Sequence, residues 1–284
     1  MFDTHCHLNF SAFKNLNEVV HNAHTAGVHY FVIPGTDFES SKKAVEITDH
    51  YEGIYAAIGI HPHHIFKIKE QCLMNGFCEP LGVIVKKELA QIEKLLTSKK
   101  IVAIGEIGID RHIYQKTKYQ TYKVDEVFIE YQKAFLKAQI DLAIQHKKSI
   151  ILHNREAKDD LLNVLREKWD EKLDGRVVFH CCEADGELLD FAKNHKVFIG
   201  IDGDITYDQK KQGFIKKIPL ELLVLETDSP FLLPEPLKSQ KVFPNEPKNL
   251  SLIAGFIAEK LHIPLSQLIE TSTKNAQKLF TFPS

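Results

Sequence analysis

Two histidines, His5 and His7, follow a short apolar start to the chain and have a spacing that suits metal chelation. On a β-strand, residues i and i+2 project from the same face, so the two imidazoles would point into one space. A His-x-His pair on its own is weak evidence for a metal site. The pair becomes informative only if further ligands reach the same place.

Four further side chains of ligand type stand at the ends of apolar runs that are typical of strands. They are Glu106, His153, His180 and Asp228. In three of the runs, apolar residues stand two or four positions before the polar side chain. They are Val102 and Ile104 before Glu106, Ile151 before His153, and Val178 before His180. Because side chains alternate across a strand, we expect each polar side chain to share a face with these neighbours, at the rim of a packed interior.

The chain alternates short apolar runs with longer amphipathic segments. Strands are predicted near residues 1–7, 28–34, 54–61, 101–107, 149–153, 176–181, 196–201 and 222–228. Helices are predicted near 16–26, 39–50, 84–99, 125–147, 156–171, 184–194, 207–218, 248–261 and 265–280. Eight such units predict an α/β fold, a single (β/α)8 TIM-type barrel domain over residues 1–284 with an extra C-terminal helix. An open doubly wound sheet is disfavoured, because no glycine-rich dinucleotide-binding turn follows the first strand.

Two connections are predicted to be long: 62–83, which holds Cys72 and Cys78, and the proline-rich 229–247. In a barrel, both would lie over the C-terminal mouth, where active sites form. All six ligand-type side chains are expected at that same end. Buried carboxylates and imidazoles are costly unless they are paired or bound to metal, so six of them at one rim indicate bound cations.

The predicted ligands combine imidazoles with carboxylates and include no cysteine cluster, which suits Zn2+, Mn2+, Mg2+ or Fe2+. Cys181 and Cys182 adjoin His180, but buried packing residues are the favoured interpretation of the two thiols. Six ligands are more than one catalytic ion needs if it keeps an open position. Two ions that share a bridging carboxylate fit the set better.

Composition limits the function classes. With 36 Lys and Arg against 38 Asp and Glu, the net charge is -2, unlike that of a tight, sequence-specific nucleic-acid binder. An enzyme that contacts nucleic acid briefly is compatible with this charge. Five irregularly spaced cysteines, no signal-peptide pattern and no apolar run long enough for a bilayer favour a reduced, cytoplasmic protein without a membrane partner.

Over nearly its whole length the chain resembles the TatD family of metal-dependent hydrolases, in the amidohydrolase-like superfamily. The motifs that carry the resemblance are Asp3-Thr4-His5-Cys6-His7-Leu8, Gly59-Ile60-His61-Pro62-His63, Ala103-Ile104-Gly105-Glu106-Ile107-Gly108-Ile109-Asp110, Leu152-His153-Asn154-Arg155, Glu226-Thr227-Asp228-Ser229-Pro230, Asn245-Glu246-Pro247, and Asn275-Ala276 with Leu279-Phe280. The resemblance implies a divalent-metal phosphodiesterase, usually described as a deoxyribonuclease. Its expected partner is DNA, bound transiently as single strands or 3′ ends.

The resemblance also implies a role for each ligand. One divalent ion (Mg2+, Mn2+ or Zn2+) would be held by His5, His7, Glu106 and Asp228, and a second by Glu106, His153 and His180. Glu106 would bridge the ions, and Asp228 would act as general base toward a metal-activated water, so these two residues are the predicted catalytic pair. A related branch bridges its ions with a carbamylated lysine, but the fourth strand offers Glu106 and no lysine here.

The substrate rim departs from the family pattern in three places. Cys182 stands where the family has a phenylalanine after His-Cys, Arg111 and His112 follow Asp110 where an aromatic is frequent, and residues 241–244 replace a basic loop. His61, His63 and Arg155 are the predicted substrate-binding residues, since they could donate hydrogen bonds to a phosphate. Packing or surface roles are equally compatible with the sequence for these three.

The altered rim keeps two alternatives open. The same two ions could hydrolyse another ester or an amide, such as an aminoacyl-tRNA ester. The barrel could also be a metal-binding scaffold without turnover, although a closed structural zinc site needs only four ligands.

Overall fold

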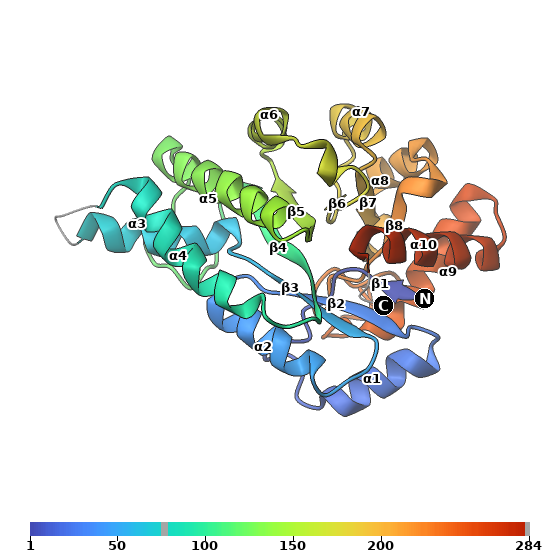
Figure 1. Ribbon diagram of the computed structural model, residues 1–284. Coiled ribbons are helices and arrows are strands. Elements are labelled where there is room, and N and C mark those ends of the chain that lie inside the picture. The colour runs from blue at the N-terminus through green and yellow to red at the C-terminus, as the bar shows by residue number, and fades with distance from the viewer. Residues whose placement is uncertain (75–78, 282–284) are drawn as a thin grey trace.

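The computed structural model describes residues 1–74 and 79–281 and contains one parallel sheet of eight strands in sequential order (Figure 1). The strands are β1 Phe2–Asp3, β2 Tyr30–Pro34, β3 Ile54–Ile58, β4 Ile101–Asp110, β5 Ser149–Arg155, β6 Val177–Phe179, β7 Phe198–Ile201 and β8 Leu223–Leu225. The predicted (β/α)8 TIM-type fold is therefore confirmed.

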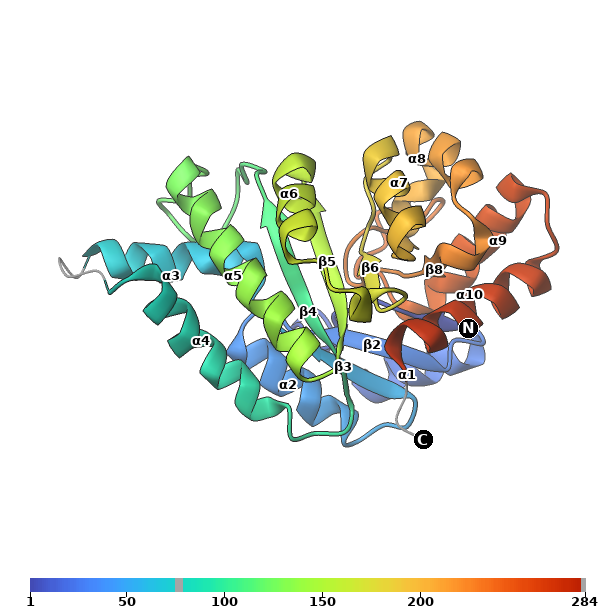
Figure 2. The same cartoon turned by 45° about the horizontal axis from the view of Figure 1, so that its top comes forward.

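Helices surround the strands on the outside, as Figure 2 shows. They are α1 Leu16–Thr25, α2 Phe38–Thr48, α3 Pro62–Met74, α4 Leu81–Leu95, α5 Glu126–Gln145, α6 Lys158–Lys168, α7 Gly186–His195, α8 Gln209–Phe214, α9 Leu250–Leu261 and α10 Leu265–Phe280. The last of these is the predicted additional C-terminal helix.

The barrel is closed between β8 and β1 by single backbone hydrogen bonds instead of a regular ladder. The N–H of Thr4 donates to the carbonyl of Leu225 over 3.1 Å, and the N–H of His7 donates to the carbonyl of Ser229 over 2.7 Å. An isolated parallel bridge joins Cys6 to Ser229. Because β1 spans only two residues, both predicted histidine ligands lie beyond its end, in the segment that these bonds fix.

Apolar side chains inside the barrel form a cluster that includes Ile151 and Val178, as the alternation predicted for the faces below His153 and His180. The prediction for β4 was wrong in one residue: Val102 lies in this inner cluster, whereas Ile104 packs in the outer cluster beneath the helices. Register shifts relative to β3, between Ala56 and Ala57, and relative to β5, between Ile104 and Ile107, interrupt the alternation. Residues on opposite sides of such an irregularity no longer alternate regularly between the two faces of the strand, so spacing in the sequence does not predict their side.

The predicted connection 62–83 is not irregular, because α3 occupies most of it. Ile65 and Phe66 are buried, and Lys69, one turn later on the same face, is only 1% exposed. The Lys69 ammonium lies 3.3 Å from both carboxylate oxygens of Asp125 and 5.1 Å from the ring centre of Phe66. A lysine in the buried stripe breaks the apolar period, which explains why the helix is hidden in the sequence. Of the two cysteines in this connection, Cys72 lies in α3 and Cys78 falls outside the described residues.

In the ranges 1–74 and 79–281, no helix taken alone has the length and apolar composition to cross a membrane. One bent pair, Pro247–Leu261 with Leu265–Phe280, meets both criteria when its members are taken together, with an angle of 113° between them.

Candidate metal centre

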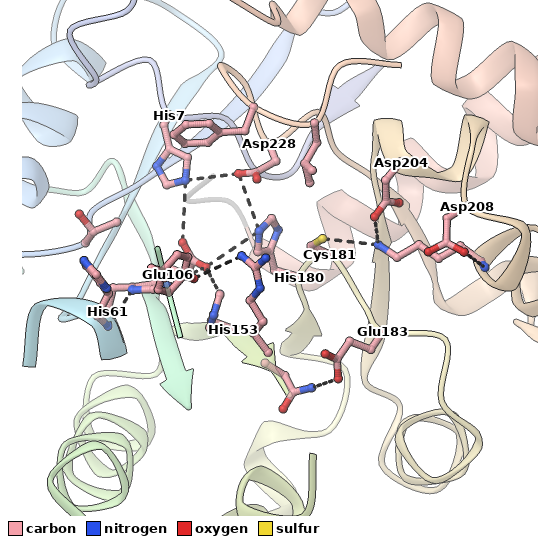
Figure 3. Close-up of a pocket in the computed structure, with 18 of the residues that line it drawn as sticks. His7, His61, Glu106, His153, His180, Cys181, Glu183, Asp204, Asp208 and Asp228 are labelled. Atoms are coloured by element: carbon pink, nitrogen blue, oxygen red, sulfur yellow. Dashed lines mark hydrogen bonds and ion pairs between the residues drawn. The ribbon is translucent and has the colours of Figure 1, made fainter. Parts of the chain in front are cut away.

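Four ligand-type side chains from three places in the chain meet above the barrel interior: His5, His7, Glu106 and Asp228. Figure 3 shows the last three of them. The Nε2 atoms of His5 and His7 lie 3.2 Å apart. Glu106 Oε2 is 3.4 Å from the first Nε2 and 3.8 Å from the second, and Asp228 Oδ1 is 3.7 and 3.4 Å from them. Ligands held about 2.1 Å from one tetrahedral ion lie about 3.4 Å from each other, so the spacing of these four atoms suits a single cation.

Backbone interactions fix the two ends of the chain that supply this group. The buried Asp3 carboxylate accepts hydrogen bonds from the N–H of Thr227 at 3.0 Å, from the Thr227 hydroxyl at 2.6 Å and from the N–H of His5 at 3.3 Å. The N–H of Asp228 donates to the His5 carbonyl over 2.9 Å. Asp228 has a left-handed φ of 50°, and its side chain points toward His7 and His180 (Figure 3). The side chains that follow β1 and β8 are therefore held together by hydrogen bonds of the protein itself.

His180 follows β6 and lies against the first group. Its ring stacks on that of His5 with a centroid distance of 3.4 Å, and its Nε2 is 3.8 Å from Asp228 Oδ1 and 3.9 Å from Glu106 Oε1. Its Nδ1 lies 2.9 Å from Glu226 Oε1. Burial alone would lower the pKa of His180, but Glu226 and the other two carboxylates outweigh burial and raise it to about 10.

His153 and His61 face the second oxygen of Glu106. The Nδ1 of His153 is 2.8 Å from Oε1, and the Nε2 of His61 is 3.5 Å from the same atom. The other nitrogen of His153, Nε2, lies 3.1 Å from Asp110 Oδ2. A hydrogen bond to the outer nitrogen fixes the ring orientation, so Nδ1 is the atom of His153 that faces the centre.

The tautomer of His61 distinguishes it from the other imidazoles. Its Nδ1 accepts a hydrogen bond from the backbone N–H of His63 over 3.1 Å. A neutral imidazole that accepts at Nδ1 carries its proton at Nε2, which then donates. His61 therefore presents a hydrogen-bond donor to Glu106 and to the adjacent cavity, even though its position alone is close enough for a ligand.

The carboxylates of the centre need positively charged partners. Glu106 is 4% exposed, and among the described residues its ion-pair partners are all imidazoles. Burial alone would raise the pKa of Glu106, but His61, His5 and His153 hold it well below the usual value. Within the described ranges, no Lys or Arg pairs with Glu106, Glu226 or Asp228. A buried set of carboxylates and imidazoles fits divalent ions chemically, because an ion gives the carboxylates a cationic partner and replaces the ring protons that His153 and His180 hold without it.

Glycine at position 200 makes room for Glu226. A Cβ on Gly200 would lie 2.5 Å from both carboxylate oxygens of Glu226, closer than non-bonded atoms approach. The same carboxylate accepts the N–H of Cys181 over 2.5 Å. The β7 strand thus leaves a space into which the acidic partner of His180 fits.

A cavity of about 900 Å3 opens over the centre and is lined by all three predicted substrate-binding residues, His61, His63 and Arg155. The His63 Nε2 lies 2.9 Å from the Thr117 hydroxyl. The Arg155 side chain is exposed, and among residues 1–74 and 79–281 it forms no ion pair. The Arg155 guanidinium at the edge of the cavity therefore has a positive charge that no acidic side chain in the described residues balances.

A buried ion cluster adjoins the cavity beside His180. The Lys211 ammonium is 2.6 Å from Asp204 Oδ2, 3.4 Å from Cys181 Sγ and 4.0 Å from Asp202 Oδ2. Lys211 is 5% exposed and Asp202 is fully buried. Cys182 is buried, as expected for a packing residue. Cys181 is only partly buried, faces the Lys211 ammonium and lines the cavity, which differs from the expectation.

Two residues near the centre were not identified from the sequence: Asp110 and Tyr114. Asp110 belongs to the motif of the fourth strand, four residues after Glu106, and that proximity was the available signal. Tyr114 lies in an irregular segment between β4 and α5, and its position depends on tertiary contacts.

Comparisons with known proteins agree with this geometry. The chain matches the family model described as TatD related DNase over residues 2–281. It is 31% identical over 283 residues to YabD of Bacillus subtilis, an uncharacterized metal-dependent hydrolase, covering 99% of this chain and 98% of the relative. It is also 31% identical over 264 residues to the 3′-5′ ssDNA/RNA exonuclease TatD of Klebsiella pneumoniae, covering 91% and 89%. The crystal structure of YjjV, a TatD homolog from Escherichia coli, aligns with a TM-score of 0.81 at 27% identity, covering 100% of this chain and 98% of that one.

Proposed function

The chain belongs to the TatD family of metal-dependent hydrolases, and on that premise we propose that it hydrolyses phosphodiester bonds in DNA, as single strands or 3′ ends. The name of the Klebsiella pneumoniae relative, a single-stranded DNA and RNA exonuclease, supports this substrate class. One observation carries the proposal. The two oxygens of Glu106 face different imidazoles, with Oε2 toward His5 and His7 and Oε1 toward His153 and His180.

Glu106 is therefore the proposed bridge between two divalent ions, Mg2+, Mn2+ or Zn2+. His5, His7 and Asp228 would complete the ligands of one ion, and His153 and His180 those of the other. When bound, such ions lower the pKa of a coordinated water and withdraw charge from the phosphate oxygens.

Asp228 is the proposed general base. Its Oδ1 faces His5 and His7, its side chain is 14% exposed, and it lines the cavity, so its carboxylate reaches both the centre and the substrate space. From this position it can accept the proton of an attacking water. The left-handed backbone and the hydrogen bond from its N–H to the His5 carbonyl hold the carboxylate in place.

Three donors are placed to bind the phosphate. His61 presents Nε2–H beside Glu106, and Arg155 presents a guanidinium with no acidic partner in the described part of the chain. His63 lines the same side of the cavity. Arginine binds phosphate oxygens through parallel hydrogen bonds, and a donor beside the reacting phosphate favours the developing negative charge.

The test uses metal-stripped protein with end-labelled single-stranded DNA and bis(p-nitrophenyl) phosphate, adding Mg2+, Mn2+ or Zn2+ separately. We expect at least one metal to restore cleavage, and Glu106→Gln to abolish it with every metal. Glu46→Gln, at an exposed carboxylate on α2, is the matched control and should cleave like the wild type. Cleavage that persists in Glu106→Gln would overturn the proposed bridge.

The side of the cavity next to His180 favours a second candidate substrate. Its lining has four acidic residues, Glu183, Asp185, Asp204 and Asp208, against two lysines, Lys210 and Lys211, of which Lys211 pairs with Asp204. Carboxylates repel a polyanionic strand and attract ammonium groups, so this side suits an ester with a free amine, such as an aminoacyl ester. Metal-dependent hydrolysis of an aminoacyl ester, with no cleavage of either phosphodiester, would replace the first proposal. Binding of two ions without turnover of any of these substrates would indicate a scaffold.

A further inference from the structure

The segment between β4 and α5 places one tyrosine, Tyr114, at the junction of the metal centre and the cavity. Its hydroxyl donates to Asp110 Oδ2 over 2.7 Å and accepts from Arg155 Nη1 over 3.3 Å. The guanidinium carbon of Arg155 lies 5.1 Å from the centre of the Tyr114 ring, within the range of a cation–π contact. Tyr114 thus contacts Arg155 through both its hydroxyl and its ring.

The other partner of the hydroxyl belongs to the centre itself. Asp110 is fully buried, and its Oδ2 is also 3.1 Å from His153 Nε2. His153 in turn faces Glu106 with Nδ1 at 2.8 Å. A continuous series of polar contacts therefore runs from Arg155 through Tyr114, Asp110 and His153 to Glu106.

Tyr114 also accounts for one departure from the family pattern. The residue directly after Asp110, where an aromatic is frequent, is Arg111, and Arg111 turns away from the cavity. Its Nε is 2.5 Å from Asp160 Oδ2 and its Nη1 is 2.8 Å from Glu126 Oε1. The aromatic ring beside the Asp110 carboxylate is instead supplied by Tyr114, four positions later.

We propose that Tyr114 is a positioning residue that holds the Arg155 guanidinium over the cavity as the binding group for a substrate phosphate. The proposal rests on the proposed function and deepens it, because it names the residue on which phosphate binding depends. Arg155 has a long, exposed side chain, and among the described residues the hydroxyl and the ring of Tyr114 hold its guanidinium. Without them the side chain must be ordered when the substrate binds, and part of the affinity is lost.

Equilibrium binding tests the proposal without turnover. Fluorescence anisotropy with labelled oligothymidylate, in EDTA, measures the affinity of the metal-free protein. We expect Arg155→Gln to weaken binding about tenfold and Tyr114→Phe, which keeps the ring, about fivefold. Because Tyr114 acts through Arg155, the double variant should bind about tenfold more weakly than the wild type, and not about fiftyfold.

Tyr122→Phe is the matched control. Tyr122 lies in the same segment. Among residues 1–74 and 79–281 its hydroxyl has no hydrogen-bond partner, and it is not one of the described residues that line the cavity. This variant should bind like the wild type. Thermal unfolding of each variant, compared with wild type, shows whether the fold is retained, and Tyr114→Leu extends the series by removing the ring.

The outcomes separate this inference from the proposed function. The inference would be overturned, even if DNA is cleaved, by a folded Tyr114→Phe variant that binds the oligonucleotide as tightly as the wild type. It would also be overturned if the double variant bound about fiftyfold more weakly, the product of the two single effects. A double variant that binds no more weakly than Arg155→Gln alone would support the inference, even if no metal restores cleavage. Failure of every metal to restore cleavage would overturn only the proposed reaction.

Discussion

Replacing Lys211 by methionine should destabilise the protein strongly at neutral pH and only weakly in mild acid. The Lys211 ammonium is 2.6 Å from Asp204 and 4.0 Å from Asp202, and the lysine is 5% exposed. Methionine preserves much of the aliphatic length, so the substitution chiefly removes the charge. The buried carboxylates then lose their cationic partner, which typically costs about 3–5 kcal/mol.

The size and sign of the pH dependence follow from the protonation of Asp202. Burial alone would raise the pKa of this carboxyl, and Lys211 is the first of the groups that hold it below its usual value. Without the lysine, the folded variant must bind a proton there, which the unfolded chain releases above a pKa of about 3.9. A carboxyl pKa that is higher in the folded state makes stability fall as pH rises. Each pH unit above about 3.9 lowers the free energy of unfolding of the variant by about 1.36 kcal/mol. The variant therefore loses about 4 kcal/mol of stability at pH 7 and about 1.5 kcal/mol at pH 5.

Urea unfolding of the metal-free protein at pH 5 and pH 7 measures both values. The matched control is Lys210→Met, because Lys210 is the exposed neighbour in α8 and should lose little stability at either pH. A loss in Lys211→Met that is equal at the two pH values would refute the reasoning. So would a loss no larger than that of the control.

Three further predictions concern the ion pairs and the centre. Asp160→Asn should lower stability by about 1 kcal/mol at pH 7, because the carboxylate pairs with Arg111 and Lys133 at 2.5 and 2.8 Å. Although burial alone would raise the pKa of Asp160, these partners lower it, so the difference should disappear as pH falls through that depressed value in acid unfolding titrations. Gly200→Ala should displace Glu226 and reduce metal affinity about tenfold by titration calorimetry, whereas Gly213→Ala, whose added Cβ meets nothing within 4 Å, should not. EDTA should lower the midpoint of thermal unfolding, since an ion at 100 times its Kd contributes about 2.7 kcal/mol, and an unchanged midpoint would contradict a bound cation.

The fold was predictable because its signals are local and repeat. Alternation of short apolar runs with amphipathic segments defines a parallel barrel, and the end of each strand then identifies the rim. The position of His153, two residues after Ile151, follows from the same alternation. These features need no knowledge of distant contacts.

Other features depend on contacts that the sequence does not display. The outward position of Ile104 results from register shifts that neighbouring strands impose on β4. Helix α3 is hidden because Lys69 lies on its buried face, where Asp125, 56 positions away, pairs with it. Glu226 can approach His180 because position 200 is a glycine, a relation between β7 and β8 that local patterns do not contain.

The centre has two halves that are held in different ways, and this difference bears on how its substrate range can change. On the β1 and β8 side, backbone hydrogen bonds and the fully buried Asp3 fix the proposed ligands His5, His7 and Asp228. On the β4 and β5 side, side chains extend the support of His153 outward, through Asp110 and Tyr114, to the exposed Arg155. Substitutions in the outer segment therefore alter the substrate space while the first half keeps its geometry. The departures from the family pattern at residues 111–112 and 241–244 lie outside the proposed ligand set. Substrate preference can change at such positions while the proposed metal ligands are kept.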